Sequence, residues 1–394
     1  MAGRALTSVS ADDSVQRPRL LFIVNVAWFF ASHRLELARA ARAEGYEVHL
    51  ACKAIDDRAV RAIETAGCTV HDVDLARGIG GPIAELRAIR RLRGILREVR
   101  PDIVHCVTIK PVLYGSILAR LAGVRGRVCA LSGLGHVFTA TGGLAALRRR
   151  LVQGIYAFAM GGRHLRVIFQ NPDDRDTFIA NRLVRPQDAV MIRGSGVDLR
   201  AYSPVETHNM PPVVLLPARM LREKGIVEFM AAAKLLQRRG VSARFVMAGG
   251  VDEGNPSHMT QPEITALAAD SGVEWLGHVA DMAAVVGQCD VVCLPSYREG
   301  LPKALLEAAG CGKPMVSTDV PGCREVVTDG WNGFLVPPQS VEPLADALQK
   351  LIADTALRAA MGARARARAL QEYSIESVIA RTLGLYAELR TASA

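Results

Sequence analysis

The residues best suited to chemistry lie between positions 219 and 307. Arg219 and Lys224 follow a β-rich run that ends at Pro217, on a segment that leads into a helix. A guanidinium fork, a point charge and the N–H groups of a helix start together suit the oxygens of a diphosphate. Two cations in a loop are also common on solvated surfaces, so this interpretation depends on what stands near them.

Two glutamates follow a later strand end, with seven residues between them. Glu299 precedes Gly300 and Leu301, whose backbone N–H groups leave room for ligand oxygens. Glu307 lies among small apolar residues of a helix predicted over 303–309, so we expect its carboxylate to be buried. Burying it unpaired costs several kcal/mol, and each hydrogen bond to the vicinal diol of a ribose would offset about 1.5 to 3 kcal/mol. The alternative is a salt bridge for Glu307 and a solvent-facing Glu299.

Alternating strands and helices must position these side chains. β-rich runs and helical segments alternate in two series, with strands expected at 19–24, 47–51, 69–73 and 101–105, then at 213–217, 244–248, 273–276, 291–295 and 314–317. Helices are expected at 33–44, 83–99 and after Pro111. This alternation predicts an α/β fold with two parallel sheets, each covered by helices on both faces. Ligands of such sheets bind beyond the carboxyl ends of the strands, so two of them imply a cleft between domains.

Length and composition divide the chain. A chain of 394 residues exceeds what one hydrophobic core organises. Residues 1–18 are polar and predict a loose tail, and a polar, proline-bearing connection over 203–212 places a boundary near residue 205. We therefore expect domains at 19–205 and 206–373.

Charge and cysteine content narrow the partners and the location. Residues 1–200 hold 30 Lys and Arg against 18 acids, whereas the remainder holds 18 against 21. The first half therefore favours an anionic partner, either nucleic acid or an anionic membrane, with a merely solvated basic face as the alternative. The sequence has no run of about 18 apolar residues, so no membrane-spanning helix is predicted. The eight cysteines form no CxxC pair, which favours reduced core thiols, a cytoplasmic location and no zinc site.

Glu299 and Glu307 together resemble the E-x7-E pair of retaining GT-B glycosyltransferases, the family of glycogen synthase and bacterial lipopolysaccharide transferases. The resemblance implies two facing Rossmann-like domains, a nucleotide-sugar donor in the second, an acceptor in the first, and neither a metal nor a cofactor. It implies ribose at Glu307, donor-sugar hydroxyls at Glu299, and the diphosphate at Arg219 and Lys224, whose charge would stabilise the leaving nucleotide. It also implies that a last helix, over 374–389 within the segment 374–394, crosses back to the first domain.

The first domain departs from the common family pattern. Many relatives have a glycine pair after the first strand, where this chain has residues 25–33 without glycine. Residues 105–111 and 131–138 instead resemble a subgroup that extends undecaprenyl-diphosphate-linked sugars. In that interpretation His136 is a catalytic histidine near the donor sugar, and the acceptor is bound by residues from three segments, namely His33, Lys110, Ser132 and Gly133. Each of the two histidines could equally be a core or surface residue, and Lys110 a solvated one.

Two basic amphipathic segments, 83–99 and 144–158, fit an anionic membrane surface, although such apolar stripes more often pack on a sheet. The predicted function is transfer of a hexose or N-acetylhexosamine from a UDP-sugar to a lipid-linked sugar, with retention, by a protein peripherally bound to the inner face of the cytoplasmic membrane. The alternatives are a UDP-sugar epimerase of similar fold and a non-catalytic nucleotide-sugar or anion-binding protein. Nucleic acid is not expected, because a polyphosphate groove would not favour two carboxylates beside Arg219.

Overall fold

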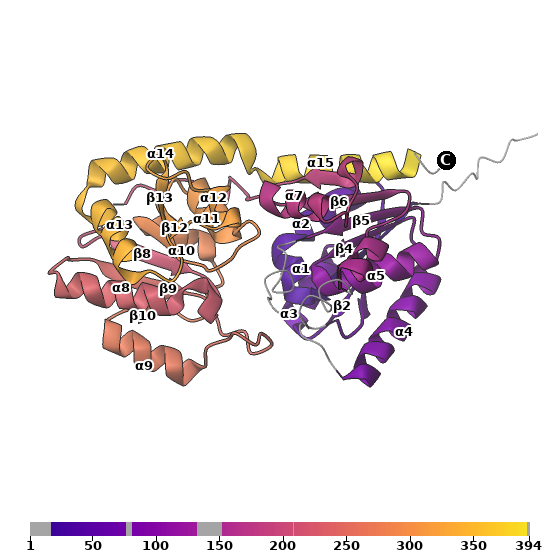
Figure 1. Cartoon of the computed structure of the whole chain (residues 1–394), viewed down its shortest axis with the longest axis horizontal. Coiled ribbons are helices and arrows are strands. Elements are labelled where there is room, and N and C mark those ends of the chain that lie inside the picture. The colour runs from indigo at the N-terminus through magenta and orange to yellow at the C-terminus, as the bar shows by residue number, and fades with distance from the viewer. Residues whose placement is uncertain (1–16, 76–80, 132–151, 208, 392–394) are drawn as a thin grey trace, which may run out of the picture.

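The computed structural model describes residues 17–75, 81–131, 152–207 and 209–391. Its strands form two parallel sheets, ordered β3-β2-β1-β4-β5-β6-β7 and β10-β9-β8-β11-β12-β13. Figure 1 shows the two sheets in separate bodies that lie side by side. The first sheet contains β1 Arg19–Val26, β2 Glu47–Lys53, β3 Thr69–Asp72, β4 Ile103–Val107, β5 Gly126–Ala130, β6 Leu165–Phe169 and β7 Ala189–Met191. The second contains β8 Val213–Pro217, β9 Arg244–Ala248, β10 Glu274–Trp275, β11 Val291–Leu294, β12 Met315–Thr318 and β13 Gly333–Val336.

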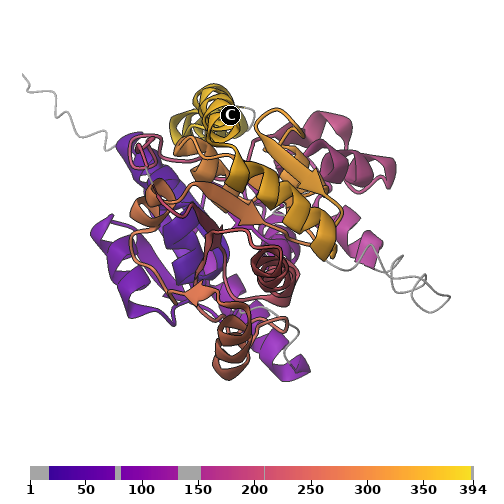
Figure 2. The ribbon, with the colours of Figure 1, turned by 90° about the vertical axis from the view of Figure 1, so that its left-hand side faces the viewer.

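Each sheet is buried on both faces because its strands are apolar throughout. In β1, Leu20 and Phe22 pack in one hydrophobic cluster while Leu21 and Ile23 pack in another on the opposite face. The strand β8 divides its side chains in the same way. Continuous apolar runs of this kind are typical of parallel strands covered by helices on both sides, an arrangement that Figure 2 shows for the second body.

The helices connect the strands in the expected order. Those of the first body are α1 Ala27–His33, α2 Leu35–Ala43, α3 Asp57–Thr65, α4 Pro82–Val99, α5 Ile109–Leu121 and α7 Pro172–Ala180. Those that follow are α8 Ile226–Arg238, α9 Gln261–Ser271, α10 Met282–Gln288, α11 Lys303–Gly310, α12 Pro321–Arg324, α13 Val341–Ala353, α14 Thr355–Glu372 and α15 Ile375–Thr391. None of the described helices is long and apolar enough to cross a membrane.

Two local expectations differ from the structure. The first helix begins at Ala27, directly after β1, and the chain bends at Arg34 (φ −134°) before α2, where one later helix was expected. The strand expected to begin at Pro101 begins at Ile103. Pro101 has no N–H for a sheet, and the Asp102 carboxylate accepts the Arg19 backbone N–H at 2.8 Å.

The last helix, α15, belongs in space to the first body, along which it runs in Figure 1. Val378, Leu385, Tyr386 and Leu389 pack in the cluster built on β1. The Tyr386 hydroxyl lies 2.6 Å from Nδ1 of His105 in β4, and both side chains are buried. The chain therefore crosses between the bodies twice, before β8 and after α14.

In both sheets the strand order reverses once in the middle, between β1 and β4 and between β8 and β11. Crevices of open α/β sheets form at such reversals, outside the carboxyl ends of the strands. The loops after β1, β4, β8 and β11 are therefore where a ligand site is expected.

Candidate functional site

The loop after β8 carries both predicted diphosphate ligands and lies against the loop after β11. Gly225 caps the start of α8 with φ +73°, and a Cβ there would lie 2.2 Å from the Pro295 carbonyl oxygen. The Tyr297 N–H donates to the Glu223 carbonyl at 2.9 Å, which joins the two loops a second time. This close approach brings Lys224 Nζ to 2.5 Å from Glu299 Oε1, with the two side chains only 18% and 10% exposed.

Glu299 is therefore not solvent-facing, and the residues after it are held from two sides. A Cβ on Gly322 would lie 2.6 Å from the carbonyl oxygens of Glu299 and Gly300, so only glycine allows α12 to lie so close. The Gly300 carbonyl accepts a hydrogen bond of 2.8 Å from Nδ2 of Asn171, the residue that caps α7 of the first body. Leu301 is buried beside it. The expected donor-sugar segment thus lies where the two bodies meet.

Glu307 is buried, as expected, with 7% of its surface exposed. The Lys303 ammonium compensates its charge, with Nζ 3.3 Å from Oε1, and the carboxylate also interacts electrostatically with the Tyr202 hydroxyl. Burial, followed by the charge of Glu307, raises the pKa of Tyr202. The salt bridge considered as the alternative role of Glu307 is thus present, and the ribose role stays a prediction.

The first body contacts the cationic loop after β8 and the first residue of α11 directly. The Arg219 guanidinium lies over the Trp28 ring, 5.5 Å from its centroid, and pairs with Asp252. Lys303 Nζ donates to the Ser32 carbonyl at 3.0 Å. Trp28, Asp252 and Lys303 had no assigned function from the sequence. The placement of Lys303 four residues before Glu307 on one helix face was the available signal for it.

His33 follows Ser32, whose carbonyl contacts Lys303, and its imidazole is neutral. Its ring stacks on Phe29 at 4.2 Å between centroids, and Nδ1 lies 2.6 Å from the Ser32 hydroxyl. Burial, with the charges of Lys303, Arg34 and Arg219, lowers the pKa of His33 to about 3. A neutral imidazole can exchange hydrogen bonds with an uncharged hydroxyl, but it adds no positive charge there.

The reversal point of the first sheet is also polar. Asn25 at the end of β1 accepts a hydrogen bond from Thr108 after β4, and Thr108 has φ +76°, a left-handed value that is strained for threonine. Lys110, the predicted acceptor cation, lies 2.8 Å from Glu85 of α4, which also accepts from the Tyr114 hydroxyl at 2.8 Å. Lys110 is therefore charge-compensated and lies at the α4–α5 contact.

Three of the predicted site residues, His136, Ser132 and Gly133, lie outside the described residues. Their roles stay predictions. Among the residues that the structure does describe, no three His, Cys, Asp or Glu side chains are grouped to hold a metal ion. The eight cysteines are free and buried.

Sequence comparison matches the two bodies separately. Residues 19–171 match the glycosyl transferase 4-like model, and residues 201–368 match glycosyl transferases group 1. The chain is 27% identical over 343 residues to N,N'-diacetylbacillosaminyl-diphospho-undecaprenol alpha-1,3-N-acetylgalactosaminyltransferase of Campylobacter jejuni, covering 84% of this chain and 88% of that protein. It is 24% identical over 323 residues to UDP-Gal:alpha-D-GlcNAc-diphosphoundecaprenol alpha-1,3-galactosyltransferase of Escherichia coli, covering 78% and 80%.

Solved structures resemble the whole chain. Sucrose-phosphate synthase of Thermosynechococcus elongatus superposes with a TM-score of 0.78 at 19% identity, over 95% of this chain and 100% of that one. HepE of Anabaena in complex with UDP and glucose superposes with a TM-score of 0.75 at 19% identity, over 94% and 100%. The predicted GT-B fold is confirmed. The chain carries a glycosyl transferase 4-like domain over residues 19–171 and a glycosyl transferases group 1 domain over residues 201–368, and it is a glycosyltransferase.

Proposed function

We propose that this enzyme transfers a hexose or N-acetylhexosamine from a UDP-sugar to a lipid-linked, diphosphate-bearing sugar, with retention at the anomeric carbon. The observation that carries the proposal is the contact of 2.5 Å between Lys224 and Glu299. It joins the loops after β8 and β11 at the strand-order reversal of the second sheet, where an α/β sheet binds its ligand.

The diphosphate of the donor would bind to the loop after β8. Arg219 and Lys224 supply a guanidinium fork and a point charge, each worth about 1.5 to 3 kcal/mol in a charge-assisted hydrogen bond to a phosphate oxygen. The N–H groups of Gly300 and Leu301 would bind oxygens of the sugar phosphate. Glu307 would bind the ribose hydroxyls, which requires its carboxylate to exchange the contact with Tyr202 or Lys303 for the diol.

The proposed reaction mechanism depends on which groups near the donor can stabilise charge or act as a nucleophile. Cleavage of the bond between the anomeric carbon and the diphosphate leaves negative charge on the nucleotide, which Arg219 and Lys224 would stabilise without a metal ion. Glu299 is bound to Lys224 rather than free as a nucleophile. We therefore propose that the acceptor hydroxyl attacks from the face that the nucleotide leaves, and that a donor phosphate oxygen takes its proton.

The acceptor assignment depends on the relatives and on the first body. The relatives from C. jejuni and E. coli are named for acceptors in which a sugar is linked through diphosphate to undecaprenol. An acceptor of that kind is held in a membrane, so we propose that the enzyme binds peripherally to the cytoplasmic face of the membrane. The exposed face of α4 suits that contact, because Ile83 and Leu86 are 75% and 50% exposed and arginines follow them along the helix.

Transfer assays with defined donors test this proposal. UDP-sugars would be screened with undecaprenyl-diphosphate-linked sugars in detergent, with and without EDTA, and the new anomeric centre assigned by NMR. We expect UDP release only with acceptor, an unchanged rate in EDTA, and an α linkage from an α-linked donor. Donor-sugar isomerisation without acceptor would identify an epimerase instead, and an inverted product would exclude the proposed mechanism.

A further inference from the structure

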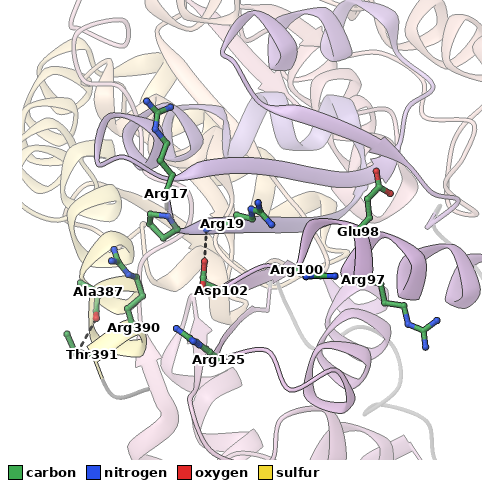
Figure 3. A pocket seen from close by; sticks show the side chains of 11 residues that line it. Arg17, Arg19, Arg97, Glu98, Arg100, Asp102, Arg125, Ala387, Arg390 and Thr391 are labelled. Atoms are coloured by element: carbon green, nitrogen blue, oxygen red, sulfur yellow. Dashed lines mark hydrogen bonds between the residues drawn. The ribbon is translucent and has the colours of Figure 1, made fainter. Parts of the chain in front are cut away.

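A second strongly basic feature lies at the opposite edge of the first sheet, away from the contacts between the bodies. A cavity of about 1140 Å³ opens beside the amino-terminal ends of β1, β4 and β5. Eleven residues line it, six of them arginines: Arg17, Arg19, Arg97, Arg100, Arg125 and Arg390. We call this cavity the arginine pocket, and Figure 3 shows its side chains.

The charges in the arginine pocket are not balanced by its own acids. Its lining holds six guanidinium groups and two carboxylates, Glu98 and Asp102, an excess of four positive charges before Glu47, which pairs with Arg19 from outside the lining, is counted. Asp102 already accepts the Arg19 backbone N–H, and the Arg19 side chain is bound to Glu47 and to the Val99 carbonyl. Within the described residues, the Arg17, Arg97 and Arg100 side chains form neither a hydrogen bond nor an ion pair.

Helix ends account for only part of this charge. The pocket lies at the carboxyl ends of α4 and α15, and each helix end carries roughly half a negative charge. Arg97 and Arg390, in the last turns of these helices, can compensate those dipoles. Arg17 precedes β1, so it belongs to neither of these helix ends.

We propose that the arginine pocket binds a phosphate group, outside the transfer site. Guanidinium forks match phosphate oxygens in geometry and charge. The volume far exceeds that of a phosphate ion, so it fits an esterified phosphate with its organic part. An anionic lipid headgroup is the expected source, since the exposed face of α4 continues from Ile83 and Leu86 through Arg90 and Arg93 to Arg97. Only this choice of source rests on the membrane association proposed above.

Vesicle and soluble-ligand binding by matched variants test the site. Arg17→Gln with Arg97→Gln removes two exposed pocket charges, and Arg238→Gln with Arg244→Gln removes two exposed charges from the second body as a control. Each arginine near an anionic surface contributes about 1 kcal/mol, so we expect the pocket variant to bind phosphatidylglycerol vesicles about 30-fold more weakly. Glycerol 1-phosphate, titrated by calorimetry, measures the site without a membrane.

The outcomes separate the two proposals. Loss of vesicle binding in the pocket variant but not in the control supports a lipid phosphate. Selective loss of glycerol 1-phosphate binding, with equal vesicle binding, supports the phosphate site and assigns it a soluble ligand. Equal binding by both variants in both assays overturns the site, whether or not the enzyme binds vesicles. A wild-type enzyme that ignores vesicles would refute only peripheral association. Transfer to a short-chain acceptor in detergent should be unchanged in both variants, which shows that they are folded.

Discussion

The contact between Lys224 and Glu299 gives opposite expectations for its two partners. Lys224→Met removes a cation from the proposed diphosphate site, so UDP should bind about 10- to 100-fold more weakly, the loss of one charge-assisted hydrogen bond. Glu299→Gln instead releases the Lys224 ammonium from a partner at 2.5 Å. UDP, which has no sugar to contact Glu299, should then bind as well as before or up to roughly fivefold more tightly, which corresponds to about 1 kcal/mol. Transfer should be strongly reduced in both variants.

Isothermal calorimetry with UDP and steady-state transfer kinetics measure the two effects separately. Lys234→Met is a matched control, since Lys234 forms an exposed pair with Asp270 at 2.7 Å in the same body. Thermal unfolding checks that each variant is folded, because removing one partner of a partly buried pair destabilises a protein. If Glu299→Gln weakens UDP binding as much as Lys224→Met, the carboxylate acts on the diphosphate site itself and the proposed division of roles is wrong.

Four further predictions follow from the site and its supports. Glu307→Gln should weaken UDP binding about tenfold but leave the binding of 2′,3′-dideoxy-UDP, which lacks both hydroxyls, unaffected. Calorimetry with both ligands would disprove the ribose contact if both weakened equally. Trp28→Ala should weaken UDP binding about two- to fivefold through the lost contact with Arg219, whereas Trp331→Ala, at an exposed tryptophan, should not. Because the pKa of His33 is lowered in the folded protein, the unfolded chain binds a proton at a higher pH than the folded protein does. The free energy of unfolding should therefore decrease as the pH drops from about 6.5 towards 3, by at most about 1.4 kcal/mol per pH unit. His33→Gln should flatten that part of the curve in urea titrations, and parallel curves would contradict a neutral His33. Tyr386→Phe should cost about 1 to 2 kcal/mol in urea titrations by leaving Nδ1 of His105 unpaired, without changing UDP binding, and unchanged stability would show that α15 does not depend on this bond.

The exposed face of α4 shows where sequence periodicity stops being informative. The spacing of Ile83, Leu86, Leu92 and Ile95 predicts one apolar stripe. In the structure Leu92 and Ile95 are buried on the sheet, whereas Ile83 and Leu86 are exposed, so the predicted single stripe is wrong. Each step of three residues turns an α-helix by about 300°, so this spacing drifts around the helix and puts Ile83 and Leu92 on opposite sides.

The sequence by itself determined the alternation of elements, the α/β fold class with two parallel sheets, and the placement of cations and carboxylates just after strand ends. These depend on runs of apolar residues, turn chemistry and helix starts, which act over a few neighbouring residues. Glu299 and Lys224 could be named from such local patterns, and so could the burial of Glu307 among alanines and leucines.

Only the tertiary structure decided which groups meet. Lys224 contacts Glu299, which is 75 residues away in the sequence. Lys303 contacts the Ser32 carbonyl across 271 residues, and Tyr386 contacts His105 across 281 residues. Such pairs depend on strand order and on how the two bodies pack, and no local pattern encodes either. The arginine pocket is of the same kind, since the chain brings its six arginines together from four separate segments at one edge of a sheet.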